Sequence, residues 1–333
     1  MRIGFFETEP WEKEILKKAF PKDRLIFSTK KLTARNVKKY SNLEALGIFV
    51  HCEINSSVLK SLPKLKFITT MSTGFDHINL EACKKRNIKV FNVPVYGENT
   101  VAEHTFALIL AISRKLTECV ERAKKGSFLL KGLRGFDLQG KTLGVIGMGN
   151  IGEHVVRIAK GFDMNVLVTD VHQDKKLAKK LGFKYAKLNT LLKNSDIITL
   201  HVPYNKHTHH LIGKEQFNLM KKSAYLINTS RGGVVDTDVL VKALKRKRIA
   251  GAALDVLEDE CEMIEEKQLL TKEYQTKCNL KTMMQNHVLL AMDNVIITPH
   301  NAFNTKEALT RIIEVTIENI KGFKQSKKVN LVI

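Results

Sequence analysis

A glycine-rich segment, Gly147-Met148-Gly149-Asn150-Ile151-Gly152, narrows the folds open to this chain more than any other stretch. It follows an apolar run that predicts a strand and precedes a pattern that predicts a helix, the setting of a dinucleotide-binding turn. Gly147 permits a tight turn, Gly149 lets the backbone approach a pyrophosphate, and Gly152 lets helix and strand pack closely. The helix N-terminus adds N–H groups for the anion. The alternative is a purely structural glycine-rich turn.

An acidic residue, Asp170, ends the next predicted strand. A carboxylate at this point accepts hydrogen bonds from both hydroxyls of an adenosine ribose and repels a 2′-phosphate. We therefore predict NAD rather than NADP as the cofactor. His172, Lys175 and Lys176 lie close behind and could soften that preference.

Short apolar runs alternate with helical patterns along all 333 residues, which predicts parallel α/β sheets. A first doubly wound unit is expected to have strands at 2–6, 25–28, 47–51, 67–70 and 89–92. A second series is expected at 142–146, 165–169, 197–201, 224–228, 250–254 and 295–298. Helices are predicted at 11–20, 56–61, 100–125 and 305–323. The mostly polar stretch 261–293 has helical patches and no strand signal, and we expect it to shape an active-site rim or a partner surface.

Two polar residues, Arg231 and His300, each follow a predicted strand. In a doubly wound sheet the carboxyl ends of the strands face the ligand crevice. The guanidinium of Arg231 offers two parallel donors to a carboxylate, and His300 can pass a proton to a ketone oxygen or take it back. Glu260 would hold the histidine in the right tautomer and charge. Taken singly, Arg231 could be a surface ion-pair partner and His300 a structural histidine.

The net charge of +21 comes mostly from lysine pairs spread along the chain, which favours a solvated surface over nucleic-acid binding. The longest apolar stretch, 106–112, is too short to span a bilayer, and no signal peptide is evident. We expect a cytoplasmic protein without a nucleic-acid or membrane partner. The five cysteines are widely spaced and form no CxxC, so reduced thiols are expected. His207, His209 and His210 are expected to form a polar loop, and no metal site is predicted.

The ordered set of motifs resembles the D-isomer-specific 2-hydroxyacid dehydrogenase family over essentially the whole chain. The matching segments are the glycine-rich turn with Asp170, His201-Val202-Pro203, Asn228-Thr229-Ser230-Arg231-Gly232-Gly233, Gly251-Ala252-Ala253-Leu254-Asp255-Val256, Glu260 and Thr298-Pro299-His300. The resemblance implies a flavodoxin-like substrate domain, 1–98 with 302–333, and an inserted Rossmann NAD-binding domain, 99–301. It implies a 2-oxo or 2-hydroxy acid as substrate, and Arg231, Glu260 and His300 as the catalytic residues.

The resemblance also implies individual contacts. Asp255 would contact the nicotinamide carboxamide, while Thr229 and Pro203 would line the nicotinamide pocket. The implied cofactor contacts are Gly147, Gly149, Asn150, Ile151, Gly152, Asp170, His201, Val202, Pro203, Thr229, Ser230, Arg231, Asp255 and His300. The implied substrate contacts are Thr73, Gly74, Phe75, Tyr96, Arg231, His300 and Phe303, with backbone N–H groups near Thr73 to Phe75 binding the carboxylate.

Four features resemble the D-lactate dehydrogenase branch of the family: Cys261 directly after Glu260, the insertion that follows, Tyr96 and Phe303. An aromatic wall would suit the methyl group of pyruvate. The alternatives are a dehydrogenase for larger or aromatic 2-oxo acids and an NAD(H)-sensing regulatory protein on the same fold. The family commonly forms homodimers through the cofactor domain, and the helix predicted at 100–125 is the expected contact.

Overall fold

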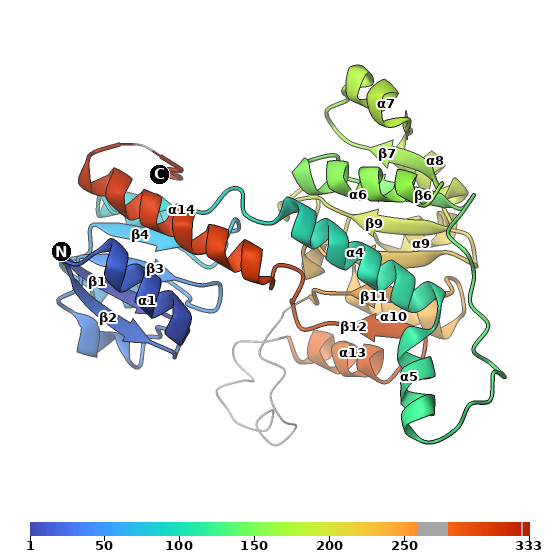
Figure 1. Ribbon diagram of the computed structural model, residues 1–333, viewed down its shortest axis with the longest axis horizontal. Helices are drawn as coiled ribbons and strands as arrows, with labels where there is room; N and C mark the ends of the chain where they lie inside the picture. The colour runs from blue at the N-terminus through green and yellow to red at the C-terminus, as the bar shows by residue number, and fades with distance from the viewer. Residues whose placement is uncertain (259–278, 328) are drawn as a thin grey trace. The chain divides into compact units, whose positions relative to one another are not determined.

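The chain divides between two units, each with its own parallel sheet (Figure 1). The computed structural model describes residues 1–258, 279–327 and 329–333. One unit comprises Met1–Gly97 with Asn304–Ile333, and the other comprises Glu98–Phe303. Glu260, Cys261 and Cys278 lie outside the described residues.

The first unit contains a five-stranded sheet in the order β2-β1-β3-β4-β5. Its strands are β1 (Arg2–Phe6), β2 (Arg24–Ser28), β3 (Ala45–Ile48), β4 (Phe67–Thr70) and β5 (Lys89–Phe91). This is the flavodoxin-like order that the resemblance implied. All residues of β3 and β4 are buried, as expected for parallel strands covered on both faces. The strand predicted at 47–51 was placed too late, because the chain leaves the sheet after Ile48.

The C-terminal helix α14 is part of this first unit. The helices here are α1 (Pro10–Ala19), η1 (Val37–Tyr40), α2 (Ser56–Lys60), α3 (Leu80–Lys85) and α14 (Lys306–Lys324). Thr305 caps α14 by accepting a hydrogen bond from the Ala308 N–H. The Phe323 ring lies 4.7 Å from that of Phe67 in β4, so the end of the chain packs on the sheet formed by its beginning.

The second unit contains a seven-stranded parallel sheet in the order β12-β11-β10-β9-β6-β7-β8. Its strands are β6 (Thr142–Ile146), β7 (Asn165–Thr169), β8 (Lys184–Tyr185), β9 (Ile197–Leu200), β10 (Tyr225–Asn228), β11 (Gly251–Leu254) and β12 (Val295–Ile297). This is a Rossmann order extended by one strand, and it reverses between β6 and β9. The two-residue edge strand β8 was not predicted, because it carries no apolar run.

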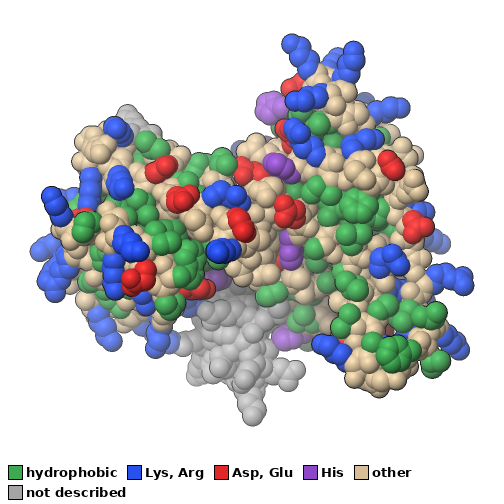
Figure 2. Space-filling view, viewed as in Figure 1, with side chains coloured by type: hydrophobic (Ala, Val, Ile, Leu, Met, Phe, Trp, Pro, Cys, Tyr) green, Lys and Arg blue, Asp and Glu red, His purple; other side chains and the backbone are tan. Residues whose placement is uncertain are grey.

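The helices of the second unit lie before and between its strands along the chain. They are α4 (Glu98–Ser113), α5 (Leu116–Lys124), α6 (Asn150–Gly161), α7 (Lys175–Leu181), α8 (Leu188–Asn194), α9 (Lys214–Leu219), η2 (Gly232–Val234), α10 (Thr237–Lys245) and α13 (Leu280–Leu290). The helix α13 confirms a helical patch in the described part of the insertion. Lys and Arg side chains are spread over both units on the face shown in Figure 2.

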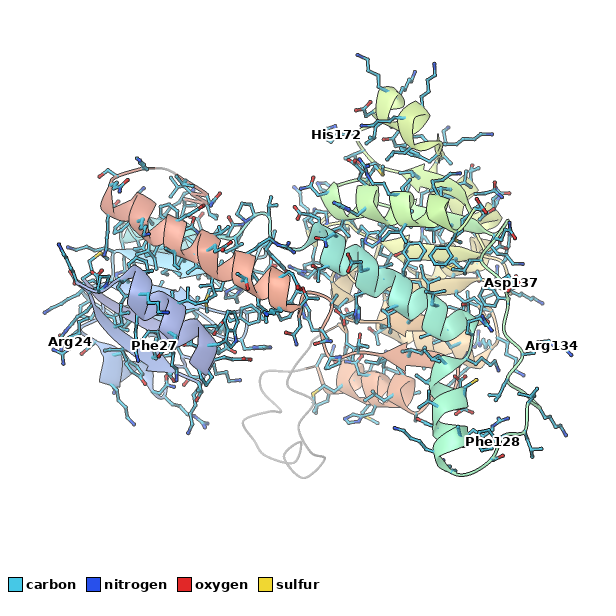
Figure 3. The ribbon with its side chains drawn as sticks, in the orientation of Figure 1. Arg24, Phe27, Phe128, Arg134, Asp137 and His172 are labelled. Carbon is cyan, nitrogen blue, oxygen red and sulfur yellow. The ribbon has the colours of Figure 1, made fainter. Side chains whose placement is uncertain are left out.

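The prediction of a single helix over 100–125 is wrong, because the chain forms two helices there, α4 and α5. Lys115 between them is left-handed, with φ of 49°. The Ser113 carbonyl accepts a hydrogen bond from the Phe136 N–H at 2.9 Å instead of continuing the helix. A Cβ on Gly135 would lie 2.2 Å from that carbonyl, so only glycine allows this approach. The segment after α5, which carries Phe128 and Asp137, returns to this point (Figure 3).

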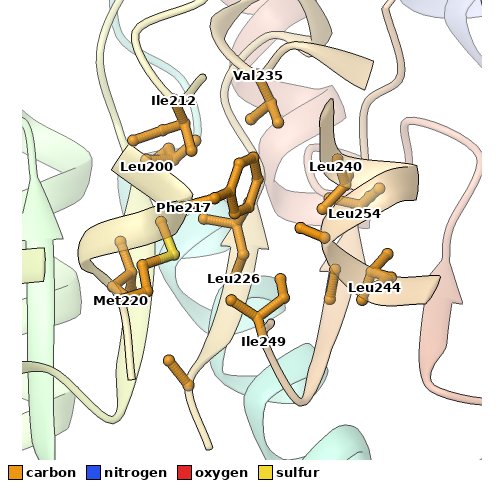
Figure 4. Packing of buried hydrophobic residues seen from close by; sticks show 14 of the residues in the cluster. Leu200, Ile212, Phe217, Met220, Leu226, Val235, Leu240, Leu244, Ile249 and Leu254 are labelled. Atoms are coloured by element: carbon orange, nitrogen blue, oxygen red, sulfur yellow. The ribbon is translucent and has the colours of Figure 1, made fainter. Parts of the chain in front are cut away.

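Two apolar cores cover the faces of the seven-stranded sheet. On one face Phe217 packs among Leu200, Leu226 and Leu254 (Figure 4). On the other face α4 and α6 pack on the sheet and on each other. These cores hold the carboxyl ends of the strands in fixed register, which is where the predicted site residues lie.

Candidate active site

The glycine-rich turn leaves no room for a side chain at two of its positions. Gly147 follows β6 with φ of +100°, and a Cβ there would lie 2.5 Å from the His201 carbonyl oxygen. A Cβ on Gly152 would lie 2.2 Å from the Gly147 carbonyl oxygen. Both positions therefore exclude any side chain, one through conformation and contact and the other through contact.

The N-terminus of α6 is open to an anion. Gly149 is the residue before the helix, no side chain caps it, and nothing lies within 4 Å of the place where its Cβ would be. Asn150 and Ile151 form the first turn, with the Asn150 amide donating to Glu98 at 3.2 Å. The free N–H groups and the helix dipole suit a pyrophosphate.

Asp170 lies directly after β7 beside this turn. Its carboxylate accepts hydrogen bonds from the N–H groups of Met148 at 2.6 Å and His172 at 2.8 Å. These bonds fix the carboxylate while each oxygen keeps lone-pair capacity for a ribose hydroxyl. His172, Lys175 and Lys176 are all exposed.

His201 follows β9, on the other side of the point where the strand order reverses. Its Nε2 lies 2.9 Å from the Thr199 hydroxyl, while its buried Nδ1 has no hydrogen-bond partner in the described structure. Burial lowers the pKa of His201 to about 3, so the ring is neutral. Val202 and Pro203 continue this segment. An orphaned buried nitrogen next to the glycine-rich turn fits a site that is completed by a ligand.

The loop that carries Arg231 is organised by Asn228 at the end of β10. The buried Asn228 amide accepts hydrogen bonds from the Ser230 N–H and hydroxyl at 3.0 and 2.8 Å, and it donates to the Arg231 carbonyl at 3.0 Å. A Cβ on Gly232 would lie 1.9 Å from Leu257, so the loop must have glycine here. The Arg231 guanidinium donates to the Ser230 carbonyl at 2.8 Å.

The loop that carries His300 wraps around Asp255 at the end of β11. The buried carboxylate accepts hydrogen bonds from the Thr298 hydroxyl and from the N–H groups of Asn301 at 2.8 Å and Ala302 at 2.9 Å. The His300 N–H donates to the Asp255 carbonyl at 2.9 Å. The backbone of His300 is in the left-handed region, with φ of 50°, and these hydrogen bonds stabilise that conformation.

Asp255 is therefore an anchor of this loop, a role that the sequence did not reveal. Burial raises the pKa of its carboxyl, but hydrogen bonds from His104, Thr298 and the loop N–H groups outweigh burial and hold the pKa below its usual value. His104 and Thr105 of α4, which bond to the loops of the candidate site, were also not predicted from the sequence. The signal that could have indicated them is a pair of polar residues directly before the apolar run Phe106–Ile112 of the same helix.

The structure brings four predicted residues to adjacent strand ends: Thr229, Arg231, Asp255 and His300. Asn228 and Leu254 are paired in register, as are Leu254 and Ile297, so β10, β11 and β12 end together. The Asp255 N–H also donates to the Asn228 carbonyl at 2.9 Å, which links the two loops. Phe303 lies beside His300, with ring centroids 6.3 Å apart and nearly perpendicular.

The predicted loop Thr73–Phe75 and Tyr96 belong to the first unit. The Thr73 hydroxyl donates to the Val93 carbonyl at 2.8 Å, and Ser72 donates to the Gly74 carbonyl at 2.7 Å. The Tyr96 carbonyl accepts a hydrogen bond from Arg311 of α14. The loop after β4 is thus held in a fixed shape.

One predicted contact involves a residue that the structure does not describe. Glu260, the expected hydrogen-bond partner of His300, lies outside the described residues. Within 1–258, 279–327 and 329–333, no group of three His, Cys, Asp or Glu side chains could hold a metal ion. In the same ranges, every helix is too short or too polar to cross a membrane. Cys52, Cys83 and Cys119 are free thiols.

A Rossmann unit with an NAD turn and an arginine and a histidine at one sheet edge defines an NAD-dependent oxidoreductase acting on CH–OH groups. The chain belongs to the D-isomer-specific 2-hydroxyacid dehydrogenase family, whose NAD-binding domain matches residues 106–302.

Relatives cover nearly the whole chain. D-lactate dehydrogenase of Escherichia coli (strain K12) is 34% identical over 98% of both chains. The structure of D-lactate dehydrogenase from Aquifex aeolicus complexed with NAD and lactic acid is 39% identical, with a TM-score of 0.85 over 99% of this chain and 98% of that one. The pyruvate reductase of Chlamydomonas reinhardtii is 34% identical, with a TM-score of 0.88 over 98% and 97%.

Proposed function

We propose that this protein reduces a small 2-oxo acid with NADH, and that pyruvate, giving D-lactate, is the preferred substrate. The observation that carries the substrate class is the Phe303 ring, which stands edge-on 6.3 Å from His300. An aromatic side chain beside the proton donor limits the room for a large substrate side chain. The relatives named for D-lactate dehydrogenase and pyruvate reductase support the same choice.

We assign the cofactor contacts to the glycine-rich turn, to Asp170 and to the segments after β9 and β10. The open N-terminus of α6 takes the pyrophosphate, and Asp170 takes the adenosine ribose. His201, Val202 and Pro203, with Thr229 and Ser230, line the nicotinamide end, where the orphaned His201 Nδ1 can pair with the ligand. When bound, the nicotinamide supplies or removes the hydride.

The proposed substrate contacts are those that the family resemblance implies. Arg231 pairs with the carboxylate through two parallel donors. Phe303 borders the substrate side chain, while the N–H groups of Thr73–Phe75 and the Tyr96 side chain are contacts that the resemblance alone implies. His300 gives its proton to the 2-oxo oxygen as the carbonyl is reduced, and it takes the hydroxyl proton in the reverse direction. Glu260 would then orient the His300 ring.

We further infer that the protein is a homodimer through α5 and the segment after it. The helix α5 has no buried residue, and Leu116 and Val120 are 53% and 43% exposed. Phe128, Leu129 and Leu130 are 82%, 72% and 83% exposed. Hydrophobic side chains gather over α5 in Figure 2. Apolar side chains with this degree of solvent exposure favour burial against a second copy of the chain.

A panel of 2-oxo acids tests the proposed substrate. With NADH, pyruvate should show the highest kcat/KM, followed by its close small analogues, and NADPH should replace NADH poorly because of Asp170. Loss of the reduced-nicotinamide absorbance is the measurement. A preference for phenylpyruvate would instead assign the aromatic substrate class. NADH binding without turnover of any 2-oxo acid would support a sensor.

A further inference from the structure

We propose that His104 and Thr105, adjacent residues of α4, are positioning residues that hold the two loops carrying Arg231 and His300. The inference rests on the proposed catalytic roles of those two residues. Each of the α4 side chains bonds to a different loop, so one helix sets the placement of both groups relative to the same sheet edge.

His104 acts on the His300 loop. Its Nε2 lies 3.1 Å from the Thr298 hydroxyl oxygen and 3.3 Å from the Asp255 carboxylate. The single hydroxyl proton of Thr298 is donated to Asp255, so the Thr298 oxygen can only accept from His104. His104 therefore carries its proton on Nε2. Since Asp255 also binds the N–H groups of Asn301 and Ala302, the histidine supports the anchor of the whole turn.

Thr105 acts on the Arg231 loop. Its hydroxyl donates to the Val101 carbonyl at 2.8 Å, within α4. The Thr229 hydroxyl lies 2.9 Å from the Thr105 oxygen and must be the donor in this bond, because the Thr105 proton is already used. Thr105 is fully buried, and Thr229 is two residues before Arg231. The bond fixes the start of the loop.

Packing alone does not require these polar groups. Several buried positions of α4 are apolar, among them Val101, Ala102, Phe106 and Ile109. The buried Thr105 hydroxyl and the partly buried His104 imidazole lose hydration, which an apolar side chain of similar size would not. Their partners are the residues next to the proposed catalytic groups, and reaction rates are sensitive to misplacement of such groups by about 1 Å.

The first test compares His104→Leu with His104→Gln, whose amide can place a donor near the Nε2 position. The leucine variant should lower kcat with the 2-oxo acid by roughly 10- to 100-fold while the Kd for NADH stays the same. The glutamine variant should recover most of the rate. Glu103→Gln, at an exposed position of the same helix, serves as the control. Equal kcat in the leucine variant and the wild type would overturn the proposal.

The second test uses Thr105→Val, which removes the hydroxyl at nearly constant volume, and Thr105→Ser, which keeps the hydroxyl and removes a methyl group. The valine variant should raise KM and lower kcat, and the serine variant should restore both.

A double-mutant cycle tests the His104 network. Thr298→Val should lower kcat only slightly further once His104→Leu is present, because both substitutions break the same network. Full additivity of the two losses would contradict the shared network.

Hydrogen exchange separates this proposal from the proposed function. Amides of Asn301 and Ala302 should exchange faster in His104→Leu than in the wild type, while those of α6 stay unchanged. If the wild type reduces no 2-oxo acid, the proposed function fails but the exchange result still tests the positioning. Unchanged exchange in the 298–302 turn would refute the role of His104.

Discussion

In this protein, backbone conformation and backbone hydrogen bonds determine where the proposed site residues lie. The positions of Arg231 and His300, each in the loop after a strand, could be predicted from the sequence because the apolar runs before them mark the strands. Asp255 was expected to contact the cofactor, and the structure adds that it anchors the His300 turn. That role depends on a left-handed His300 and on N–H directions, which no sequence pattern encodes.

Replacing His300 by alanine tests its role as proton donor. We expect kcat to fall by roughly 10²–10⁴-fold while NADH still binds, because the cofactor turn after β6 is untouched. His287→Ala on α13 is a matched control, a histidine outside the proposed site, and it should keep the wild-type rate. Steady-state rates and NADH fluorescence titrations give the two readings. A His300→Ala enzyme with near-normal kcat would mean that another group carries the proton.

Among the helices and strands, local pattern predicted the buried elements well. The bounds of β1, β4, β6 and β7 are those expected from the apolar runs. The predictions are wrong where contacts between distant segments of the chain determine the local structure. The break between α4 and α5 arises because Phe136 takes the Ser113 carbonyl, a contact invisible to helix periodicity.

The link between β9, β6 and the end of α9 should depend on pH. Asp196 accepts hydrogen bonds from Lys221 and from the Thr142 N–H, at 2.8 and 2.9 Å. Burial raises the pKa of Asp196, but these partners outweigh it and leave the pKa below its usual value. A lowered folded-state pKa stabilises the fold above the unfolded pKa of about 3.9, and this stability is lost as the pH falls through the folded pKa.

Asp196→Asn should therefore reduce the free energy of unfolding at pH 7 by about 1 kcal/mol, since the ion pair is partly exposed and screened. The difference from wild type should shrink as the pH falls below about 4. Urea unfolding at a series of pH values measures it. A penalty that is the same at every pH would show that the charge on Asp196 does not contribute.

At the level of the complete protein, the strand and helix patterns predicted two α/β units with parallel sheets, and the structure has two parallel sheets. The alternation of strand and helix patterns is enough for this, because parallel strands need crossover helices. The flavodoxin-like and Rossmann strand orders were implied by the family resemblance, and the structure has both orders. The surface proposed for the homodimer was less predictable: the expected helix is broken, and the exposed apolar residues lie on α5 and on the segment Phe128–Leu130 that follows it.

Sedimentation velocity tests the proposed homodimer. The wild type should sediment as a dimer, and the double variant Phe128→Asp with Leu130→Asp should shift toward monomer, because charge replaces the apolar contact. Val171→Asp, at another exposed apolar position, is the control and should leave the oligomer unchanged. A monomeric wild type, or a dimer indifferent to the double variant, would contradict this interface.

We infer that Arg231 and His300, with NADH, make this chain a dehydrogenase for the D form of a small 2-hydroxy acid. The most direct measurement is the configuration of the product formed from pyruvate and NADH, read by chiral chromatography. We expect D-lactate in an amount equal to the NADH consumed. L-lactate, a racemic product, or NADH consumption without lactate would contradict it.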